Sequence, residues 1–453
     1  MSFRITGNMK LLKIYLGWII VFCLVFGVAI WLTNEGRYFN EKRHAVAYAS
    51  SNFHLKDQAN FKRVASEENN TEDTSLSRIS NHDTITRVIT KQSQRLPLFT
   101  KEYLETVAPE IFNRVPEHFL PEYRNPCWLE NGTLWCLPYF YIIGFHKCGT
   151  TDLFDKLLFH PSVLKVGKEP HWWAIRRLGL KKHFSLHADI IKEVQALPGA
   201  QDVSSFAWYL NWFKYQTVAH VQGSSLSIKD SNGTPKTFHS KVFGDGSVST
   251  LTRVIFEPWD KVFPGGEDPD LLPYLMHAIQ PQAKIIITLR DPVSRFKSMY
   301  YRKFAHGSSP TSLHQYAVLA VRCATKCLKE SGVRHCAYFS HCQNLPQIYL
   351  GIYVAFIKHW ATVYGLENML ILRMEDKLKH PVSEFRKVLN YLELENLSDA
   401  ECERIMNTKV FNQNKAGHQE MLNETKALLR EFYKPFNKQL ATFLNDEMYL
   451  FGY

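Results

Sequence analysis

The sequence of 453 residues contains no internal repeat, no C-x2-C pair and no GxxxxGK(S/T) motif. The first absence argues against a solenoid or other repeat architecture. The second argues against the common zinc folds, whose ligands often come in such pairs, and the third disfavours a nucleoside triphosphatase with a Walker loop. Disorder of the whole chain is also excluded, because 45% of the residues are hydrophobic and 21% are charged, as in globular proteins.

Acidic residues are in the minority: 43 Asp and Glu stand against 54 Lys and Arg, which gives a formal net charge of +11 at pH 7. An excess of positive charge favours an anionic partner, such as nucleic acid, acidic lipid or acidic polysaccharide. Composition alone does not choose among the three.

One long hydrophobic run, Ile14–Thr33, contains no charged residue. Its length matches a helix that crosses a bilayer, so we predict a single transmembrane anchor. Arg4, Lys10 and Lys13 precede the run without an acidic neighbour, which favours a cytosolic N-terminus and a type II orientation. A cleaved signal peptide is the alternative, but the sequence after the run offers no convincing small-x-small cleavage site.

This orientation divides the chain into four regions. We predict a cytosolic tail over 1–13, a signal-anchor helix over 14–33, a polar lumenal stem over 34–95 and one lumenal globular domain over 96–453. In a lumenal chain five N-glycosylation sequons become usable: Asn69, Asn131, Asn232, Asn396 and Asn423.

Eight of the nine cysteines follow the hydrophobic run, where an oxidising lumen favours disulfides. Cys127 and Cys136 are spaced to close a small loop. We expect Cys148 to be a free thiol, which leaves Cys402 without an obvious partner. Four further cysteines lie close together and predict two disulfides of undetermined connectivity, with a zinc site as the alternative: Cys323, Cys327, Cys336 and Cys342.

Three short apolar runs have the character of β-strands: Tyr139–Ile143, Lys284–Leu289 and Met369–Leu372. Each leads through a polar turn into a segment with helical periodicity. Alternating strands and helices predict an α/β fold with a central parallel sheet flanked by helices. Because ligands of such sheets bind at the carboxyl ends of the strands, we expect the three turns to face one crevice.

The first turn has the pattern of an anion-binding loop. Residues 141–158 read YIIGFHKCGTTDLFDKLL, a strand, a loop bounded by glycines and a helix that begins near Thr150. Backbone amides at such a helix start, with the hydroxyls of Thr150 and Thr151, can bind an anion. Lys147 precedes Gly149, in contrast to the order of a Walker loop. A glycine-containing turn without a ligand is the alternative interpretation.

The second turn, in IIITLRDPVSRFKSMYY, ends a strand at Arg290 and starts a helix at Pro292 behind a capping Asp291. We expect Arg290 at the carboxyl end of the strand, and Ser298, about two turns into the helix, facing the same crevice. A guanidinium and a hydroxyl together suit a phosphate. Plain helix capping by the Arg-Asp-Pro sequence is the alternative.

These segments resemble the nucleotide-binding motifs of sulfotransferases that use 3′-phosphoadenosine 5′-phosphosulfate (PAPS). GFHKCGTT is similar to their 5′-phosphosulfate loop, Arg290 with Ser298 to their 3′-phosphate site, and LILRMEDKLKHPVSEFRKVLNYLEL to a later βα unit. The resemblance covers most of residues 139–453 in the family's order. It implies a P-loop-like sulfotransferase fold, PAPS as co-substrate and no metal.

The resemblance also implies which residues contact PAPS. Lys147 would stand beside the oxygen that leaves with adenosine 3′,5′-bisphosphate, which makes it a catalytic residue as well. Lys415 lies where related enzymes have a basic loop that closes over the nucleotide, although NQNKAGH lacks their Lys-Gly-Arg order. The implied PAPS-binding residues are Lys147, Cys148, Gly149, Thr150, Thr151, Arg290, Ser298 and Lys415.

VGKEPHWW, residues 166–173, resembles the segment with the catalytic glutamate in heparan sulfate sulfotransferases. Because an alcohol is a poor nucleophile at neutral pH, this likeness implies that Glu169 is the general base. An exposed carboxylate paired with Lys168 is the alternative. His171 is a rival base, but we expect it to have a structural role or to contact the acceptor. Asp245, in the sequence GDGS, is expected to touch the acceptor or the base, or to form a simple turn.

FHKCGTTDLF, KEPHWW and the later segment MLNETKALLREFYKPFNKQLATFL resemble Golgi enzymes that modify chondroitin. The likeness implies a Golgi membrane enzyme with a lumenal catalytic domain, and an acidic glycosaminoglycan rather than nucleic acid as partner; a homodimer stays open. The modified group would be the 6-O position of N-acetylgalactosamine 4-sulfate. Alternatives are a heparan-type or other glycan sulfotransferase, a tyrosine sulfotransferase, a lumenal kinase and a membrane-tethered glycan-binding protein without turnover.

Overall fold

The computed structural model describes residues 99–180, 187–229, 232–253, 268, 270–304, 308–339, 342, 345, 347–408 and 419–453. The predicted cytosolic tail, anchor helix and stem lie outside the described residues, and so does Lys415. Within the described ranges, none of the helices has both the length and the apolar character that a membrane span requires.

The central element of the described residues is a parallel sheet of four strands in the order β6, β3, β7, β8. β3 pairs with β7, and β7 pairs with β8, in parallel. β3 is buried along its whole length and β7 is buried except at Lys284, as expected of strands covered on both faces. The three predicted strands and the parallel sheet are therefore confirmed. The strands are β6 Gly244–Asp245, β3 Phe140–Ile142, β7 Lys284–Leu289 and β8 Met369–Arg373.

Strand β6 occupies the first two residues of the GDGS sequence, where a simple turn is one expectation. Gly244 and Asp245 pair in parallel with Phe140 and Tyr141. A Cβ atom at Gly244 would lie 2.2 Å from Cε2 of Phe140, so the aromatic ring packs directly over the glycine. The turn interpretation holds for the end of this segment, because the Asp245 carboxylate accepts a hydrogen bond from the backbone N–H of Ser247, two residues on, as in an Asx turn. The strand was not predicted, because two residues leave no periodic signal in the sequence.

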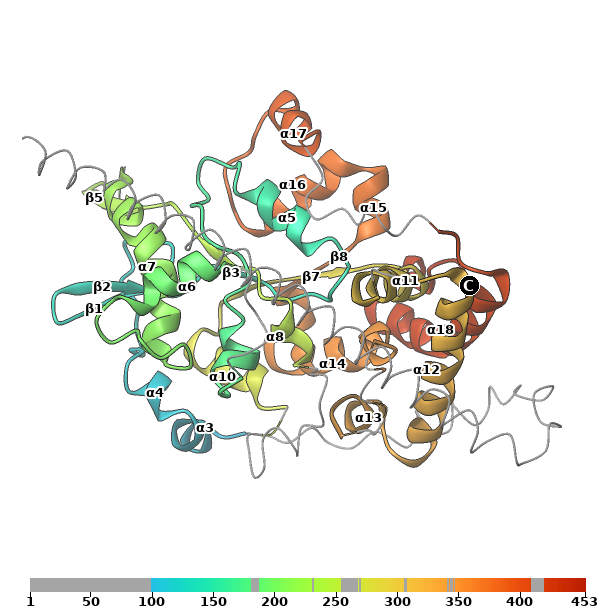
Figure 1. The fold of residues 1–453 in the computed structure, drawn as a ribbon. Coiled ribbons are helices and arrows are strands. Elements are labelled where there is room, and N and C mark those ends of the chain that lie inside the picture. The colour runs from blue at the N-terminus through green and yellow to red at the C-terminus, as the bar shows by residue number, and fades with distance from the viewer. Residues whose placement is uncertain are drawn as a thin grey trace, which may run out of the picture. The chain divides into compact units, whose positions relative to one another are not determined.

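Helices cover both faces of the sheet. Figure 1 shows α5 and α15 to α17 on one side of the strands and α10 and α14 on the other. The α-helices of the described residues are α3 Lys101–Val107, α4 Pro109–Phe112, α5 Thr150–Leu157, α6 Ala188–Gln195, α7 Phe206–Gly223, α8 Ser249–Thr252, α10 Leu272–Ile279, α11 Pro292–Lys303, α12 Pro310–Glu330, α13 Val333–Phe339, α14 Tyr353–Tyr364, α15 Met374–Lys379, α16 Pro381–Tyr391, α17 Asp399–Met406 and α18 Asn423–Leu444.

Smaller elements complete this part of the chain. Two antiparallel hairpins lie outside the central sheet: β1 Cys127–Glu130 with β2 Thr133–Cys136, and β4 Ser225–Lys229 with β5 Pro235–His239. The short helices are the π-helix η1 Trp172–Arg176 and the 3-10 turns η2 Tyr349–Gly351, η3 Leu366–Asn368 and η4 Glu447–Leu450.

Two helices that follow the strands begin where the local sequence favours a helix start. The N-cap of α11 is Asp291, whose carboxylate accepts hydrogen bonds from two backbone N–H groups of the first turn, and Pro292 is the first helical residue. α5 follows Gly149, whose φ of 80° lies in the left-handed region that favours glycine. The predicted helix starts near Thr150 and at Pro292 are confirmed.

Three disulfides join cysteines of the described residues. One bond closes the β1–β2 hairpin, and the other two connect α12 with α13 and with the segment beyond it. The predicted pairing of the four clustered cysteines is confirmed, and the zinc alternative is wrong for them because all four sulfur atoms are in covalent bonds. Cys148 and Cys402 are free and buried, as expected. The disulfides are Cys127–Cys136, Cys323–Cys342 and Cys327–Cys336.

Candidate active site

The loop between β3 and α5, residues 143–149, leads from the carboxyl end of the strand into the first turn of the helix. Lys147 and Gly149 have positive φ angles of 69° and 80°. This backbone brings the first amides of α5, at Thr150 and Thr151, to the end of the sheet. The first N–H groups of a helix have no partner within the helix and carry partial positive charge. The β3–α5 loop therefore has the elements of an anion site.

Arg290 lies at the carboxyl end of β7 and contacts the β3–α5 loop directly. Its Nη1 atom donates a hydrogen bond to the carbonyl oxygen of Lys147, at 3.4 Å. Burial, followed by the charges of Arg302 and Arg290, lowers the pKa of Lys147. Arg302 and Arg290 thus both lie within electrostatic range of Lys147, and a bound anion would reduce this repulsion. Ser298 is half-buried on α11, one helical turn before Arg302.

Glu169 lies within electrostatic range of the same loop. Burial lowers the pKa of His146 to about 4, and the charge of Glu169 opposes this shift. Because His146 directly precedes Lys147, the coupling brings the KEPHWW segment and the β3–α5 loop into one region. The side chain of His146 is neutral near pH 7.

The carboxylate of Glu169 is 15% exposed and is held by two neighbours. Oε1 forms an ion pair with Nζ of Lys168, and Oε2 lies 3.4 Å from Nε2 of His171. Burial favours the neutral acid, but the hydrogen bond from His171 and the charge of Lys168 outweigh it, so the pKa of Glu169 lies below its usual range. Glu169 is therefore ionised at neutral pH. Its backbone has a φ of 66°, an uncommon conformation that often marks functional sites.

The side chain of His171 is buried next to Glu169. It is 2% exposed. Nδ1 hydrogen-bonds with Oγ of Ser249 at 2.8 Å, and the backbone N–H donates to Oγ of Ser247 at 2.9 Å. A contact with the acceptor does not fit this placement. The ring is buried, and its two nitrogens already face Glu169 and Ser249. His171 supports the carboxylate.

Asp245 is also away from solvent, at 1% exposure. One carboxylate oxygen accepts a hydrogen bond from the Tyr209 hydroxyl at 3.0 Å, and the other accepts one from the Ser247 backbone N–H at 2.8 Å. Direct contact with an acceptor does not fit this burial. Asp245 instead belongs to a chain of hydrogen bonds that continues through Ser247 to His171, so it is linked to the proposed base indirectly.

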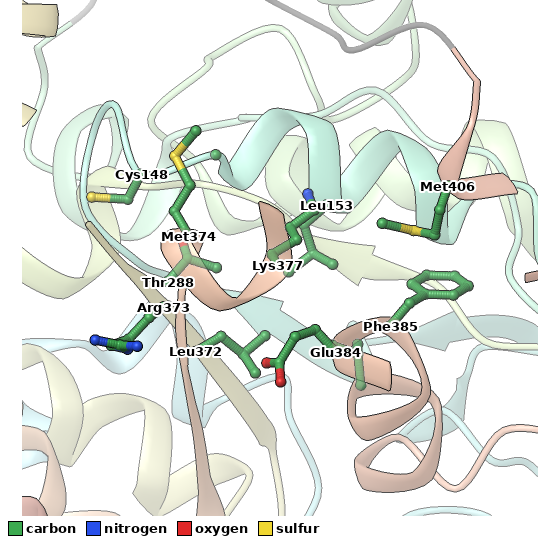
Figure 2. Close-up of a pocket in the computed structure, with 12 residues that line it drawn as sticks. Cys148, Leu153, Thr288, Leu372, Arg373, Met374, Lys377, Glu384, Phe385 and Met406 are labelled. Atoms are coloured by element: carbon green, nitrogen blue, oxygen red, sulfur yellow. The ribbon is translucent and has the colours of Figure 1, made fainter. Parts of the chain in front are cut away.

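A pocket adjoins the β3–α5 loop next to α15 and α16 (Figure 2). Its unoccupied space, including the opening to solvent, is about 350 Å³. Lys377 of α15 forms an ion pair of 2.5 Å with Asp152 of α5, which ties the two helices together beside the pocket. The lining is mainly apolar around Cys148 and Gly149: Leu153, Leu372, Met374, Phe385, Val388 and Met406, with Thr288, Arg373, Lys377 and Glu384 as polar members.

Several residues of this region were not identified from the sequence. Arg302 could have been identified from the sequence, because it lies four residues after Ser298 and hence on the same face of α11. His146, Ser247 and Ser249 acquire their contacts only through the tertiary fold. In the part of the chain that the structure describes, no three His, Cys, Asp or Glu side chains are grouped to hold a metal ion.

Several known sulfotransferases are similar to this chain. The family model described as "Sulfotransferase domain" matches residues 269–441. Carbohydrate sulfotransferase 15 of Mus musculus is 28% identical over 94% of this chain and 85% of that protein. Carbohydrate sulfotransferase 15 of Nototodarus sloanii is 34% identical over 26% of this chain and 76% of that protein. The bifunctional heparan sulfate N-deacetylase/N-sulfotransferase of Drosophila melanogaster is 23% identical over 65% of this chain and 24% of that protein.

The parallel sheet, the loop at the end of β3 and the matched domain define an enzyme that acts as a sulfotransferase. Its sequence is similar to carbohydrate sulfotransferase 15 along nearly its whole length. The chain belongs to the carbohydrate sulfotransferase 15 family. The predicted membership in the carbohydrate sulfotransferases is confirmed, and the roles that GFHKCGTT, Arg290 and KEPHWW imply stay predictions.

Proposed function

We propose that this enzyme transfers the sulfuryl group of PAPS to the 6-hydroxyl of N-acetylgalactosamine 4-sulfate in chondroitin or dermatan sulfate. The observation that carries the proposal is an ionised, mostly buried carboxylate, Glu169, within electrostatic range of His146, the residue before Lys147 in the cationic loop. The relatives named carbohydrate sulfotransferase support a sugar acceptor. The net charge of +11 suits an acidic polysaccharide.

The described residues fit PAPS as the donor. Lys147 and the amides of Thr150 and Thr151 would hold the 5′-phosphosulfate, and Arg290 with Ser298 would hold the 3′-phosphate. Closure of a loop with Lys415 over the nucleotide stays a prediction. PAPS supplies a sulfuryl group already bonded to a phosphate that can leave.

Two side chains then have separate tasks in the reaction. Glu169 accepts the proton of the acceptor hydroxyl while an electron pair of that oxygen forms the new bond to sulfur. Lys147 stabilises the negative charge on the bridging oxygen as its bond to sulfur breaks and adenosine 3′,5′-bisphosphate leaves. Lys168 and His171 keep Glu169 ionised and oriented. As in phosphoryl transfer, most of the acceleration would come from in-line positioning and charge neutralisation.

We propose a Golgi membrane location with the N-terminus in the cytosol. Residues 14–33 would anchor the chain, 34–95 would form the stem, and 96–453 would form the lumenal catalytic domain. The three disulfides of the described residues support an oxidising compartment.

The acceptor is tested with the full-length chain, purified in detergent and supplied with PAPS that carries radiolabelled sulfate. Chondroitin, chondroitin 4-sulfate, dermatan sulfate, heparan sulfate and a tyrosine peptide are offered separately, and labelled disaccharides are separated after digestion. We expect label at the 6-O position of 4-sulfated N-acetylgalactosamine. Label in heparan sulfate alone would support the second candidate, a heparan-type enzyme, which the KEPHWW segment also suggests. Label only in the peptide would refute both sugar acceptors.

A further inference from the structure

Tyr353, the first residue of α14, contacts both loops of the candidate nucleotide site. Its side chain is 1% exposed, and its ring packs against Phe145 with centroids 4.5 Å apart. The hydroxyl donates a hydrogen bond of 2.6 Å to the carbonyl oxygen of Arg290 and lies 3.8 Å from Sγ of Cys148. Burial raises the pKa of Tyr353 well above its usual value, so the hydroxyl keeps the proton that it donates. One buried group thus links the β3–α5 loop to the turn between β7 and α11.

The β7–α11 turn has two further contacts besides that with Tyr353. The backbone N–H of Asp291 donates to Oε1 of Glu375 at 2.8 Å, and the Tyr453 hydroxyl donates to Oδ1 of Asp291 at 2.9 Å. These two contacts fix the turn to α15 and to the end of the chain. They do not connect the turn with the β3–α5 loop, as the Tyr353 hydroxyl does.

We infer that Tyr353 is a positioning residue that sets the distance between the two anion-binding loops, and thereby the affinity for a nucleotide with phosphates at both its 3′ and 5′ positions. The inference rests on the proposed use of PAPS. A nucleotide with phosphates at two fixed positions binds tightly only if the two anion-binding loops are already correctly spaced before it binds. Tyr353 is buried and acts through Arg290 and Cys148, so loss of its hydroxyl affects nucleotide binding more than the chemical step.

The same helix offers a matched control. Tyr364, the last residue of α14, is 3% exposed, and its hydroxyl has no hydrogen-bond partner among the described residues. Tyr353→Phe and Tyr364→Phe therefore remove the same atom from two buried tyrosines of one helix. Both variants keep the aromatic ring and its packing. Only Tyr353→Phe breaks a link between the loops.

The experiment measures the Kd for adenosine 3′,5′-bisphosphate by calorimetry, and kcat and the KM for PAPS, on the full-length wild type and both variants. For Tyr353→Phe we expect Kd and KM to rise about three- to tenfold, the effect of one lost hydrogen bond, with little change in kcat. Tyr364→Phe should match the wild type. Cys148→Ala is a second variant, and combining it with Tyr353→Phe should weaken binding by less than the product of the two single effects.

An unchanged Kd in Tyr353→Phe, with the wild type binding the nucleotide, would overturn the inference and leave the proposed function standing. Equal weakening in both tyrosine variants would also overturn it, because the effect would then come from core packing. A wild type that binds no adenosine 3′,5′-bisphosphate would refute the proposed function and the inference together.

Discussion

Glu169→Gln is expected to lower kcat for sulfuryl transfer by about 10²–10⁴-fold, the usual contribution of a general base. Glutamine has nearly the same shape, but its amide cannot accept the proton of the acceptor hydroxyl. Nucleotide binding should persist, because the groups proposed to hold PAPS lie in the β3–α5 loop and at Arg290. The measurement is steady-state kinetics with labelled PAPS, together with the Kd for adenosine 3′,5′-bisphosphate.

Glu403→Gln is the matched control for this variant, since Glu403 is exposed on α17 and is not among the residues proposed to bind substrate or transfer a proton. The lowered pKa of Glu169 adds a pH signature. A carboxylate with a depressed pKa keeps its basic form above that pKa, so wild-type kcat/KM should decline only below the usual glutamate range, near 4.3. A Glu169→Gln enzyme with wild-type kcat would show that another group removes the proton.

Lys147→Met is expected to lower kcat by about 10²–10³-fold, as when one group that stabilises developing charge is removed from an active site. The negative charge on the departing phosphate oxygen would lose its nearest cation. The substitution should change the backbone strain little. Lys147 has a φ of 69°, a conformation that is as uncommon for methionine as for lysine. Rates at saturating PAPS separate this effect from weaker binding.

Lys329→Met serves as the comparison, because Lys329 is exposed near the end of α12. Its kinetics should equal those of the wild type. If Lys147→Met raised only the KM for PAPS and left kcat intact, Lys147 would be a binding residue without a role at the leaving oxygen.

The sequence predicts the parts of the site that depend on local patterns. The apolar runs at 284–289 and 369–372, the helix start at Pro292 and the glycine before α5 follow from periodicity and capping, and the structure has each of them. The turns that carry Lys147 and Arg290 meet as expected, because the carboxyl ends of neighbouring parallel strands lie at one edge of a sheet.

Other features depend on contacts between residues far apart in the chain. Asp245 lies in a glycine-rich segment that looks like a turn, yet it is buried in β6 because Phe140 packs over Gly244. The burial of His171 depends on α8, which contributes Ser249. Tyr353 reaches Arg290 from 63 residues along the chain. No local pattern marks such positions. The sequence alone therefore leaves His171 open between base, structural support and acceptor contact, and Asp245 open between acceptor, base and turn.

The most direct test of the account is a structure of the enzyme with adenosine 3′,5′-bisphosphate bound. The account predicts the 5′-phosphate at the backbone amides of residues 149–151 beside Lys147, and the 3′-phosphate on Arg290 and Ser298, with the Glu169 carboxylate facing the 5′ side. A nucleotide bound away from these loops, or with the Glu169 carboxylate out of reach of its 5′ end, would contradict it.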